Sequence, residues 1–236
     1  MGLPSRRHVS LLLPAAAASI IPAGSEGRVV LLGDSVFANK AYLGEGPDVA
    51  MQLDQLLPSG WAAIQGAVDG AVVGSIPAQL QRLPSHSSHL VVSIGGNDAL
   101  RHLGLLQEGA SSMADALDRL AELKERFREG YAAMLVQVLG HGLPTGICTI
   151  YEGRMPDPRV RRLALTALSL FNDVIVREAF ARGVPILDLR LICQDEDDYA
   201  NPIEPSVVGG AKIARAILQL ITHHRFAARR SEAFAG

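Results

Sequence analysis

An apolar strand that stops at a Gly-Asp-Ser turn constrains the fold more than any other stretch of this chain. Residues 28–32 read Arg-Val-Val-Leu-Leu, and Gly33, Asp34 and Ser35 follow directly. A short apolar run bounded by a turn is typical of a buried strand. Open α/β sheets keep their chemistry at the carboxyl ends of such strands. The pattern therefore predicts a strand that presents the Ser35 hydroxyl at that edge.

Strand-like and helix-like segments alternate along the rest of the chain. Helical periodicity and helix-favouring residues predict helices over 47–57, 76–83, 112–139, 159–182 and 206–223. Short apolar runs predict four more strands over 61–68, 89–94, 145–151 and 184–189. Strands that alternate with helices favour a parallel, doubly wound sheet. We therefore expect an α/β fold, a three-layer α/β/α sandwich with a mostly parallel five-stranded sheet.

The chain is long enough for one compact domain with short appendages. We expect the domain over 27–225, an N-terminal extension or signal-like segment over 1–26, and a C-terminal tail over 226–236. A basic start followed by an apolar, alanine-rich run over 9–23 resembles a secretory signal. A cytoplasmic and an exported protein both fit this segment. No other segment has the roughly 18 uninterrupted apolar residues of a transmembrane helix.

Composition narrows the classes of partner. The formal net charge is -2 over 236 residues, of which 48% are hydrophobic. This balance gives no electrostatic reason to expect nucleic acid or an anionic membrane surface as partner. The two cysteines, Cys148 and Cys193, have no ligand-like spacing and are expected to be buried free thiols.

Three loops that follow predicted strands carry small or polar residues suited to acyl chemistry. Ser35 follows the first strand, Gly70 and Gly74 the second, and Asn97 the third, within Gly-Gly-Asn-Asp. In a parallel sheet these loops gather at one edge. A serine, glycine N–H groups and a carboxamide are the parts of a nucleophile with an oxyanion hole. The alternative to a catalytic role is a structural one, with Ser35 in an ordinary turn and Asn97 in an Asx turn.

The order and spacing of these blocks resemble the SGNH (GDSL) hydrolases over roughly residues 28–223. The resemblance implies the SGNH-hydrolase type of flavodoxin-like sandwich. It also implies that Ser35 is the nucleophile. The oxyanion would be bound by the Ser35 N–H, the Gly74 N–H and the Asn97 side chain, with Gly70 the less favoured match for the glycine.

The fourth block departs from the family pattern Asp-x-x-His-Pro. Here Asn201 stands in place of the aspartate and Glu204 in place of the histidine, followed by Pro-Ser. An ordinary glutamate is about two pKa units less basic than a histidine and needs burial or a nearby negative charge to act as base near neutral pH. A helix N-terminus just after Glu204 would instead favour the charged carboxylate. Glu204 as base, with Asn201 orienting it, and Glu204 as a helix-capping acid both stay open.

Several other residues are candidates for this site. We expect Asp34, Asp98 and Arg154 to contact the substrate, because each follows a predicted strand. Arg154 would bind an anionic substrate group, pair with Glu204 or form a surface ion pair. Other candidates are His102 as an alternative base and Asp198 as a substitute for the missing aspartate.

The spacing of His86 and His89 suits a metal but lacks a third ligand, so no metal or cofactor is expected.

These patterns predict a serine hydrolase that cleaves a small-molecule carboxylic ester through an acyl-enzyme on Ser35. The Glu204 substitution leaves open a second class, a ligand-binding protein that kept the pocket and lost the base. An acyltransferase is a third alternative, because transfer to an alcohol uses the same intermediate.

Overall fold

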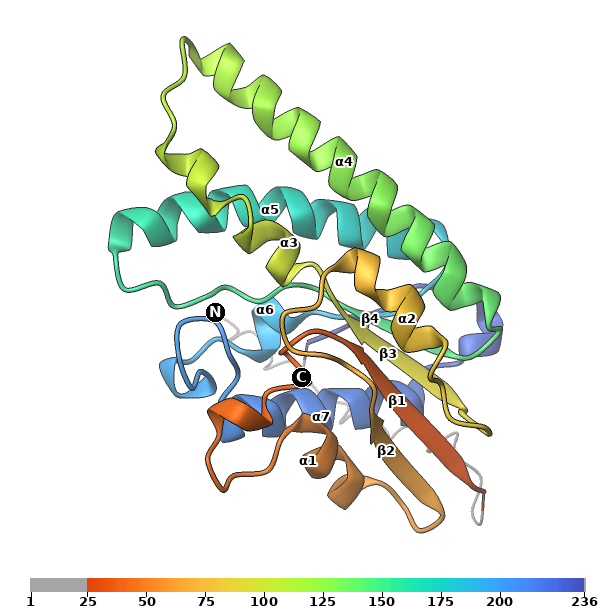
Figure 1. Ribbon diagram of the computed structural model, residues 1–236. Helices are drawn as coiled ribbons and strands as arrows, with labels where there is room; N and C mark the ends of the chain where they lie inside the picture. Colours follow the sequence, from red (N-terminus) through yellow and green to blue (C-terminus); the bar gives the residue numbers. More distant parts are fainter. Residues whose placement is uncertain (1–24, 236) are drawn as a thin grey trace, which may run out of the picture.

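The computed structural model describes residues 25–235, which form a three-layer sandwich around one parallel sheet (Figure 1). The strand order is β2-β1-β3-β4-β5-β6. The predicted α/β class and parallel sheet are confirmed, with six strands in place of five. The strands are β1 (Gly27–Gly33), β2 (Trp61–Gln65), β3 (His89–Ser93), β4 (Thr145–Cys148), β5 (Ile186–Leu187) and β6 (Ala233–Phe234).

Helices cover both faces of the sheet. In Figure 1, α2, α4 and α5 lie on one face and α1 and α7 on the other. Each face has its own buried apolar cluster, so β1 and β3 are covered on both sides. The helices are α1 (Val49–Leu56), α2 (Ile76–Leu80), α3 (Gly96–Leu100), α4 (Met113–Gly140), α5 (Pro158–Ala181), α6 (Leu189–Ile192) and α7 (Val207–His223).

Side-chain caps explain where the longer helices begin. Asp157 accepts hydrogen bonds from two backbone N–H groups of the first turn of α5, and Ser206 does the same for α7. Both satisfy donors that a helix start leaves unpaired. Pro158 occupies the first position of α5, where its missing N–H costs nothing. The predicted bounds of these two helices are confirmed to within one residue.

The strand order creates a switch point between β1 and β3. The chain leaves β1 for β2 on one side and returns to place β3 on the other side of β1. Ligand sites of open α/β sheets form at such points, outside the carboxyl ends of the strands. Ser35 follows β1 and Asn97 follows β3 by four residues, so the loops that carry them are neighbours.

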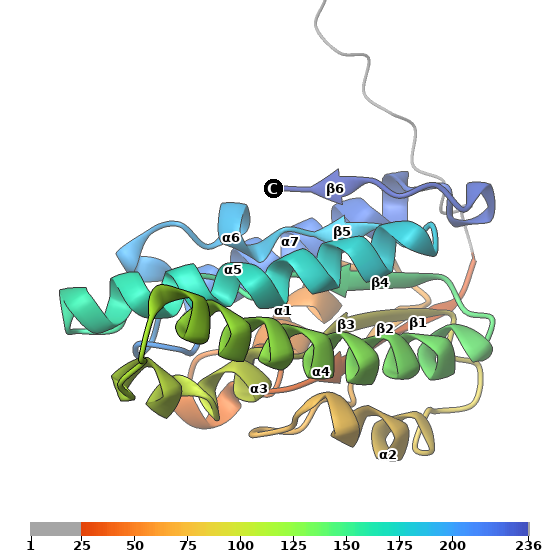
Figure 2. The same cartoon turned by 90° about the horizontal axis from the view of Figure 1, so that it is seen from above.

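The sixth strand comes from the segment expected to be a tail. Ala233 and Phe234 pair with β5 at the edge of the sheet (Figure 2). His224 is fully buried, and its Nδ1 lies 2.9 Å from a carboxylate oxygen of Glu232. Its ring packs edge-on against Phe226. These contacts fix the C-terminal segment against the domain. The expected signal-like segment lies almost entirely in residues 1–24, outside the described residues.

Candidate active site

The turn that carries Ser35 is fixed by a close approach of β1 to β3. Gly33 has φ +133°, and a Cβ there would lie 1.8 Å from the Ser93 carbonyl oxygen, so only glycine fits. The Asp34 N–H donates to that carbonyl at 3.1 Å. The chain then turns, and Ser35 lies at the carboxyl edge, 8% exposed. The strand-end position predicted for Ser35 is where the structure places it.

Gln79 of α2 holds the same turn from the other side. Its amide oxygen accepts the Gly33 N–H at 2.8 Å, and its amide nitrogen donates to the Gly33 carbonyl at 2.7 Å. Both polar groups of a buried amide are thereby satisfied, and the residue two before Ser35 is clamped. Sequence reasoning did not find Gln79, because a single glutamine in a short helix carries no distinctive signal.

The Asn97 side chain lies in the first turn after β3 and contacts the loop that follows β2. Its Nδ2 donates to the Ala71 carbonyl at 2.9 Å, which leaves its second amide hydrogen for another acceptor. Asp98, the next residue, accepts the Val73 N–H at 3.0 Å. These two bonds dock the loop after β2 onto α3. The structure therefore brings the loop of Asn97 and the loop over 69–75, here called the glycine loop, together, as expected.

The two glycines of that loop are placed differently. Both are exposed and outside the wall of the cavity that contains Ser35, and Gly74 lies in the short 3-10 helix Val73–Ser75. Gly70 has φ +74° and stands between Asp69 and Ala71. Asp69 acts on Glu204 through its charge, and Ala71 accepts the Asn97 bond. The turn around Gly70 is therefore the part of the loop that faces the other site residues.

The loop that carries Glu204 is held by hydrogen bonds through its backbone. The Asn201 side-chain oxygen accepts the N–H groups of Ile203 and Glu204 at 2.9 and 3.0 Å. Asn39, fully buried after β1, donates to the Pro205 carbonyl at 3.0 Å. Asn201 thus shapes an Asx turn that positions Glu204 through the backbone, rather than through a bond to the carboxylate. A Cβ at Gly209 would lie 2.2 Å from the Asp198 carbonyl oxygen, so a glycine in α7 permits this loop to close.

The Glu204 carboxyl group is buried at the end of this loop, and its pKa is raised from 4.5 to about 7. Burial is the main cause, because the side chain loses most of its contact with water (the residue is 3% exposed). The negative charge of Asp69 adds to the rise, while a hydrogen bond from the Ser35 side chain lowers the pKa. One carboxylate oxygen, Oε2, has no hydrogen-bond partner within the described residues. Glu204 therefore lies against Ser35 with a pKa in the range of an ordinary histidine.

The two aspartates of the motifs lie beside this pair. Burial raises the pKa of Asp34 to about 7, with smaller contributions from the charges of Glu204 and Asp98, against the lowering effect of the Val36 N–H bond. Burial also raises the pKa of Asp98, opposed by the Val73 N–H bond. Asp34 lines the cavity, whereas Asp98 is turned toward the glycine loop.

Arg154 forms the ion pair that was one of its expected alternatives, and Asp198 takes a structural role. The Arg154 side chain donates to the Gln194 carbonyl, lies 3.4 Å from a Glu196 carboxylate oxygen and stacks over the Tyr199 ring. Within the described residues it pairs with Glu196 and forms no ion pair with Glu204. Asp198 is fully buried, and its carboxylate lies 2.8 Å from Lys212 Nζ of α7. Asp198 therefore holds its own loop on α7 and does not replace the missing aspartate.

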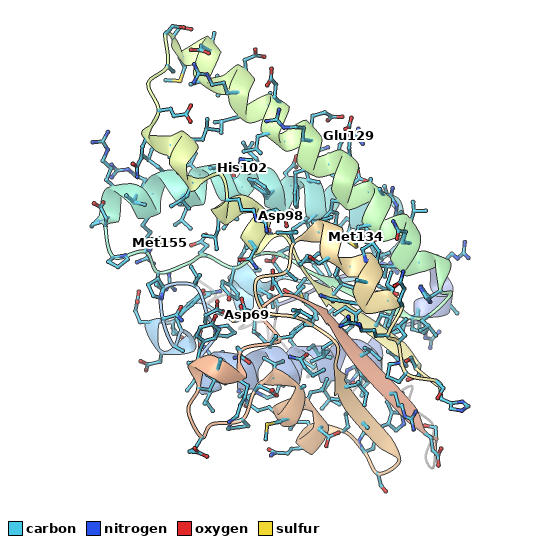
Figure 3. The ribbon with its side chains drawn as sticks, viewed as in Figure 1. Asp69, Asp98, His102, Glu129, Met134 and Met155 are labelled. Atoms are coloured by element: carbon cyan, nitrogen blue, oxygen red, sulfur yellow. The ribbon has the colours of Figure 1, made fainter. Side chains whose placement is uncertain are left out.

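The histidines are separated by the fold. His102 follows α3 and lines the cavity, whereas His89 begins β3, at the opposite edge of the sheet, against the Trp61 ring. Figure 3 shows Asp98 and His102 on α3 and the turn after it, and Met155 on the loop that leads into α5. Among residues 25–235, no three His, Cys, Asp or Glu side chains are grouped so as to hold a metal ion.

A large apolar cavity leads away from Ser35. Together with the open solvent at its mouth, it spans about 1010 Å³ of space that no atom fills. The first halves of α4 and α5 extend past the carboxyl ends of the strands (Figure 1). The cavity lies between these helices, α3 and the 3-10 helix Leu103–Gln107. Its wall is formed chiefly by apolar residues, eight leucines among them, with Ser35, Asn97 and Glu204 at one end and a single arginine, Arg161.

No helix within the described part of the chain combines the length and the apolarity that crossing a membrane requires. Both cysteines are buried free thiols, as predicted.

The family model described as the GDSL-like lipase/acylhydrolase family matches residues 31–209. Among solved structures, the lipase Lip_vut3 from a goat rumen metagenome has a TM-score of 0.65 at 16% identity, covering 85% of this chain and 99% of that one. An extracellular lipase of Streptomyces rimosus has a TM-score of 0.59 at 18% identity, with coverages of 83% and 100%.

A phospholipase A1 of Streptomyces albidoflavus also has a TM-score of 0.59, at 17% identity, with coverages of 80% and 96%. At these identities the structures show a shared fold. A comparison with curated protein sequences finds no match.

Proposed function

The chain belongs to the GDSL-like lipase/acylhydrolase family, and on that premise we propose that it hydrolyses carboxylic esters through an acyl-enzyme on Ser35, with Glu204 as the general base. The observation that carries this proposal is the contact of the Ser35 hydroxyl with a buried carboxylate whose pKa is raised to about 7. A base works best when its pKa lies near the operating pH. Burial supplies to Glu204 the basicity that the missing histidine would have had.

The reaction proceeds in two proton-balanced halves. Ser35 Oγ attacks the ester carbonyl carbon while Glu204 takes the hydroxyl proton, and Glu204 then returns that proton to the departing alcohol. The acyl-serine is hydrolysed when Glu204 removes a proton from water and the hydroxide oxygen attacks the acyl carbon. The same proton finally returns to Ser35. No third residue is needed to fix a tautomer, because a carboxylate has none.

The oxyanion is bound by three donors: the Ser35 N–H, the second amide hydrogen of Asn97 and the Gly70 N–H. We place Gly70 here in preference to Gly74, because its turn lies between residues that interact with Asn97 and Glu204. Within residues 25–235, neither the Ser35 N–H nor the Gly70 N–H is used in another hydrogen bond. Preorganised donors of this kind lower the barrier of acyl transfer by several kcal/mol.

The cavity between α4 and α5 holds the apolar part of the substrate. Apolar residues, eight leucines among them, form most of its wall, and burial of each methylene contributes about 0.8 kcal/mol. Esters with an apolar chain are therefore expected to be better substrates than acetates.

Steady-state hydrolysis of p-nitrophenyl octanoate tests the proposal. Ser35→Ala is expected to lower kcat by about 10³-fold or more, and Glu204→Gln by about 10²-fold or more. The matched controls, Ser85→Ala and Glu129→Gln, change exposed residues far from the cavity and should retain activity. Full activity in Ser35→Ala would refute the proposal. Binding of the ester without turnover by the unaltered protein would instead support the ligand-binding alternative.

A further inference from the structure

One face of α5 forms a continuous wall of the cavity. The residues that line it recur at helical spacing, at positions 161, 164, 165, 167, 168 and 171. The inner end of this face is fixed beside β4, because the Asn172 side chain makes two hydrogen bonds to the Ile150 backbone, at 2.8 and 2.9 Å. Ten residues separate Phe171 from Arg161, which is about 15 Å along the helix.

The opposite wall is apolar along the same length. It consists of leucines from the 3-10 helix Leu103–Gln107 and from the start of α4, namely Leu103, Leu105, Leu106, Leu120 and Leu123. Apart from His102 and the Tyr151 phenol, the ionisable groups of the wall lie at its two ends, Asp34 and Glu204 beside Ser35, and Arg161 on the outer turns of α5. The cavity is therefore apolar in its middle and charged where it begins and where it ends.

The positive charge of Arg161 is only partly balanced by the protein. Its guanidinium lies 3.7 Å from a carboxylate oxygen of Glu196, and the same oxygen lies 3.4 Å from Arg154. Glu196 is itself mostly exposed, and one carboxylate shared by two guanidinium groups leaves one positive charge over. Within residues 25–235 the Arg161 side chain makes no hydrogen bond. Its fork of N–H donors is therefore free to bind a carboxylate or phosphate in two-point geometry.

Arg161 is the fourth residue of α5, and the positive end of that helix dipole already faces the Asp157 carboxylate, which caps the first turn. The positive charge open to a bound anion is therefore that of the Arg161 guanidinium itself.

From this arrangement we propose that the substrate carries an anionic group, held by Arg161, at the end of an apolar spacer that separates it from the scissile ester. The proposal rests on the proposed function, because it assumes that the ester lies at Ser35. An extended chain advances about 1.2 Å per bond, so the length of the α5 face, about 15 Å, corresponds to about twelve bonds. The carbonyl and the carboxylate at the two ends take up part of this length, which leaves a spacer of roughly eight to ten carbons. The substrate class is thus a bipolar medium-chain ester, with its carbonyl at Ser35 and a carboxylate at Arg161.

The anionic group has two possible sources within one substrate, the far end of the acyl chain or the far end of the alcohol. Mono-p-nitrophenyl esters of straight-chain dicarboxylic acids of 4 to 12 carbons carry it on the acyl side. Acetate esters of the matching hydroxy acids carry it on the alcohol side. Each is compared with the same compound in which the free carboxylate is capped as a methyl ester. The measured quantity is the ratio of kcat/KM for the charged compound to that for the capped compound.

This ratio is expected to rise with chain length and to exceed one at about eight to ten carbons, in one of the two series. Arg161→Gln should lower the ratio about tenfold at that length, which corresponds to about 1.4 kcal/mol. Arg162→Gln is the matched control, because Arg162 is the neighbouring arginine of α5, exposed and outside the cavity wall. Glu196→Gln should raise the ratio, because it removes the carboxylate that competes for Arg161.

A ratio that stays flat with chain length, or that falls equally in Arg161→Gln and Arg162→Gln, would overturn the proposal while leaving ester hydrolysis intact. A binding measurement on an inactive variant tests the anionic subsite even if the protein does not hydrolyse esters. Calorimetric titration of Ser35→Ala protein with monomethyl and dimethyl sebacate should show tighter binding of the charged monoester, with the difference lost when Arg161→Gln is added. Equal affinities would reject the anionic subsite, whether or not the unaltered protein hydrolyses esters.

Discussion

Replacement of Glu204 by glutamine should stabilise the protein at alkaline pH while it lowers kcat by about 10²-fold or more. Folding raises the pKa of this carboxyl group from 4.5 to about 7, so the folded state holds a proton that the unfolded state has lost between these values. Stability therefore falls as pH rises through this window, and the loss is complete above pH 7. A rise of about 2.5 units corresponds to about 3 kcal/mol. Glutamine carries no charge to bury and escapes this cost.

The assay is urea unfolding of the unaltered protein and Glu204→Gln at pH 5 and pH 8. Glu204→Gln also changes the free energy of unfolding in ways that do not depend on pH, such as the loss of the Ser35 hydrogen bond. These changes cancel in the difference between the two pH values. We expect the variant to gain about 2 kcal/mol between pH 5 and pH 8 relative to the unaltered protein. Glu204→Gln also removes the negative charge that raises the pKa of Asp34, and this change in stability has the same sign. A difference that is absent, or that favours the variant at pH 5, would refute the assignment of a buried, proton-binding Glu204.

Three further predictions concern the same site and its supports. In a pH-rate profile, kcat/KM of the unaltered protein should rise with pH through an inflection near 7. Asp69→Asn should move that inflection to lower pH, because the Asp69 charge raises the pKa of Glu204. Ala164→Phe should narrow the cavity, and a p-nitrophenyl ester series should show a several-fold preference shifting from octanoate to acetate. Asp198→Asn should lower the free energy of unfolding in urea by about 2 kcal/mol, because it breaks the pairing of a fully buried carboxylate with Lys212. The inflection of kcat/KM with pH should be the same in this variant as in the unaltered protein.

Much of the fold could be predicted because its signals are local. The apolar runs that became β1 and β3 and the capped starts of α5 and α7 lie within short windows of sequence. The strand β6 has only two residues and follows a basic segment, so no periodicity marks it. Its place in the sheet depends on pairing with β5, 47 positions earlier along the chain.

The site shows the same limit. Ser35 and Asn97 could be placed from their strands, whereas the basicity of Glu204 could not. The local signal, a helix start just beyond it, predicts a lowered pKa. The rise in pKa comes from burial beneath loops that are distant in sequence, such as the one that places Asn39 against Pro205. The burial of Asp198 within an acidic run likewise depends on Lys212, fourteen residues later.

The central claim is that Ser35 becomes acylated with the help of Glu204. Reaction of the protein with a fluorophosphonate, followed by intact mass and peptide mapping at pH 6, 7 and 8, tests it most directly. The account predicts a single adduct on Ser35, formed faster as pH rises through 7 and at least 10²-fold more slowly in Glu204→Gln. An unlabelled protein, an adduct on another residue, or a labelling rate that is the same in Glu204→Gln would contradict it.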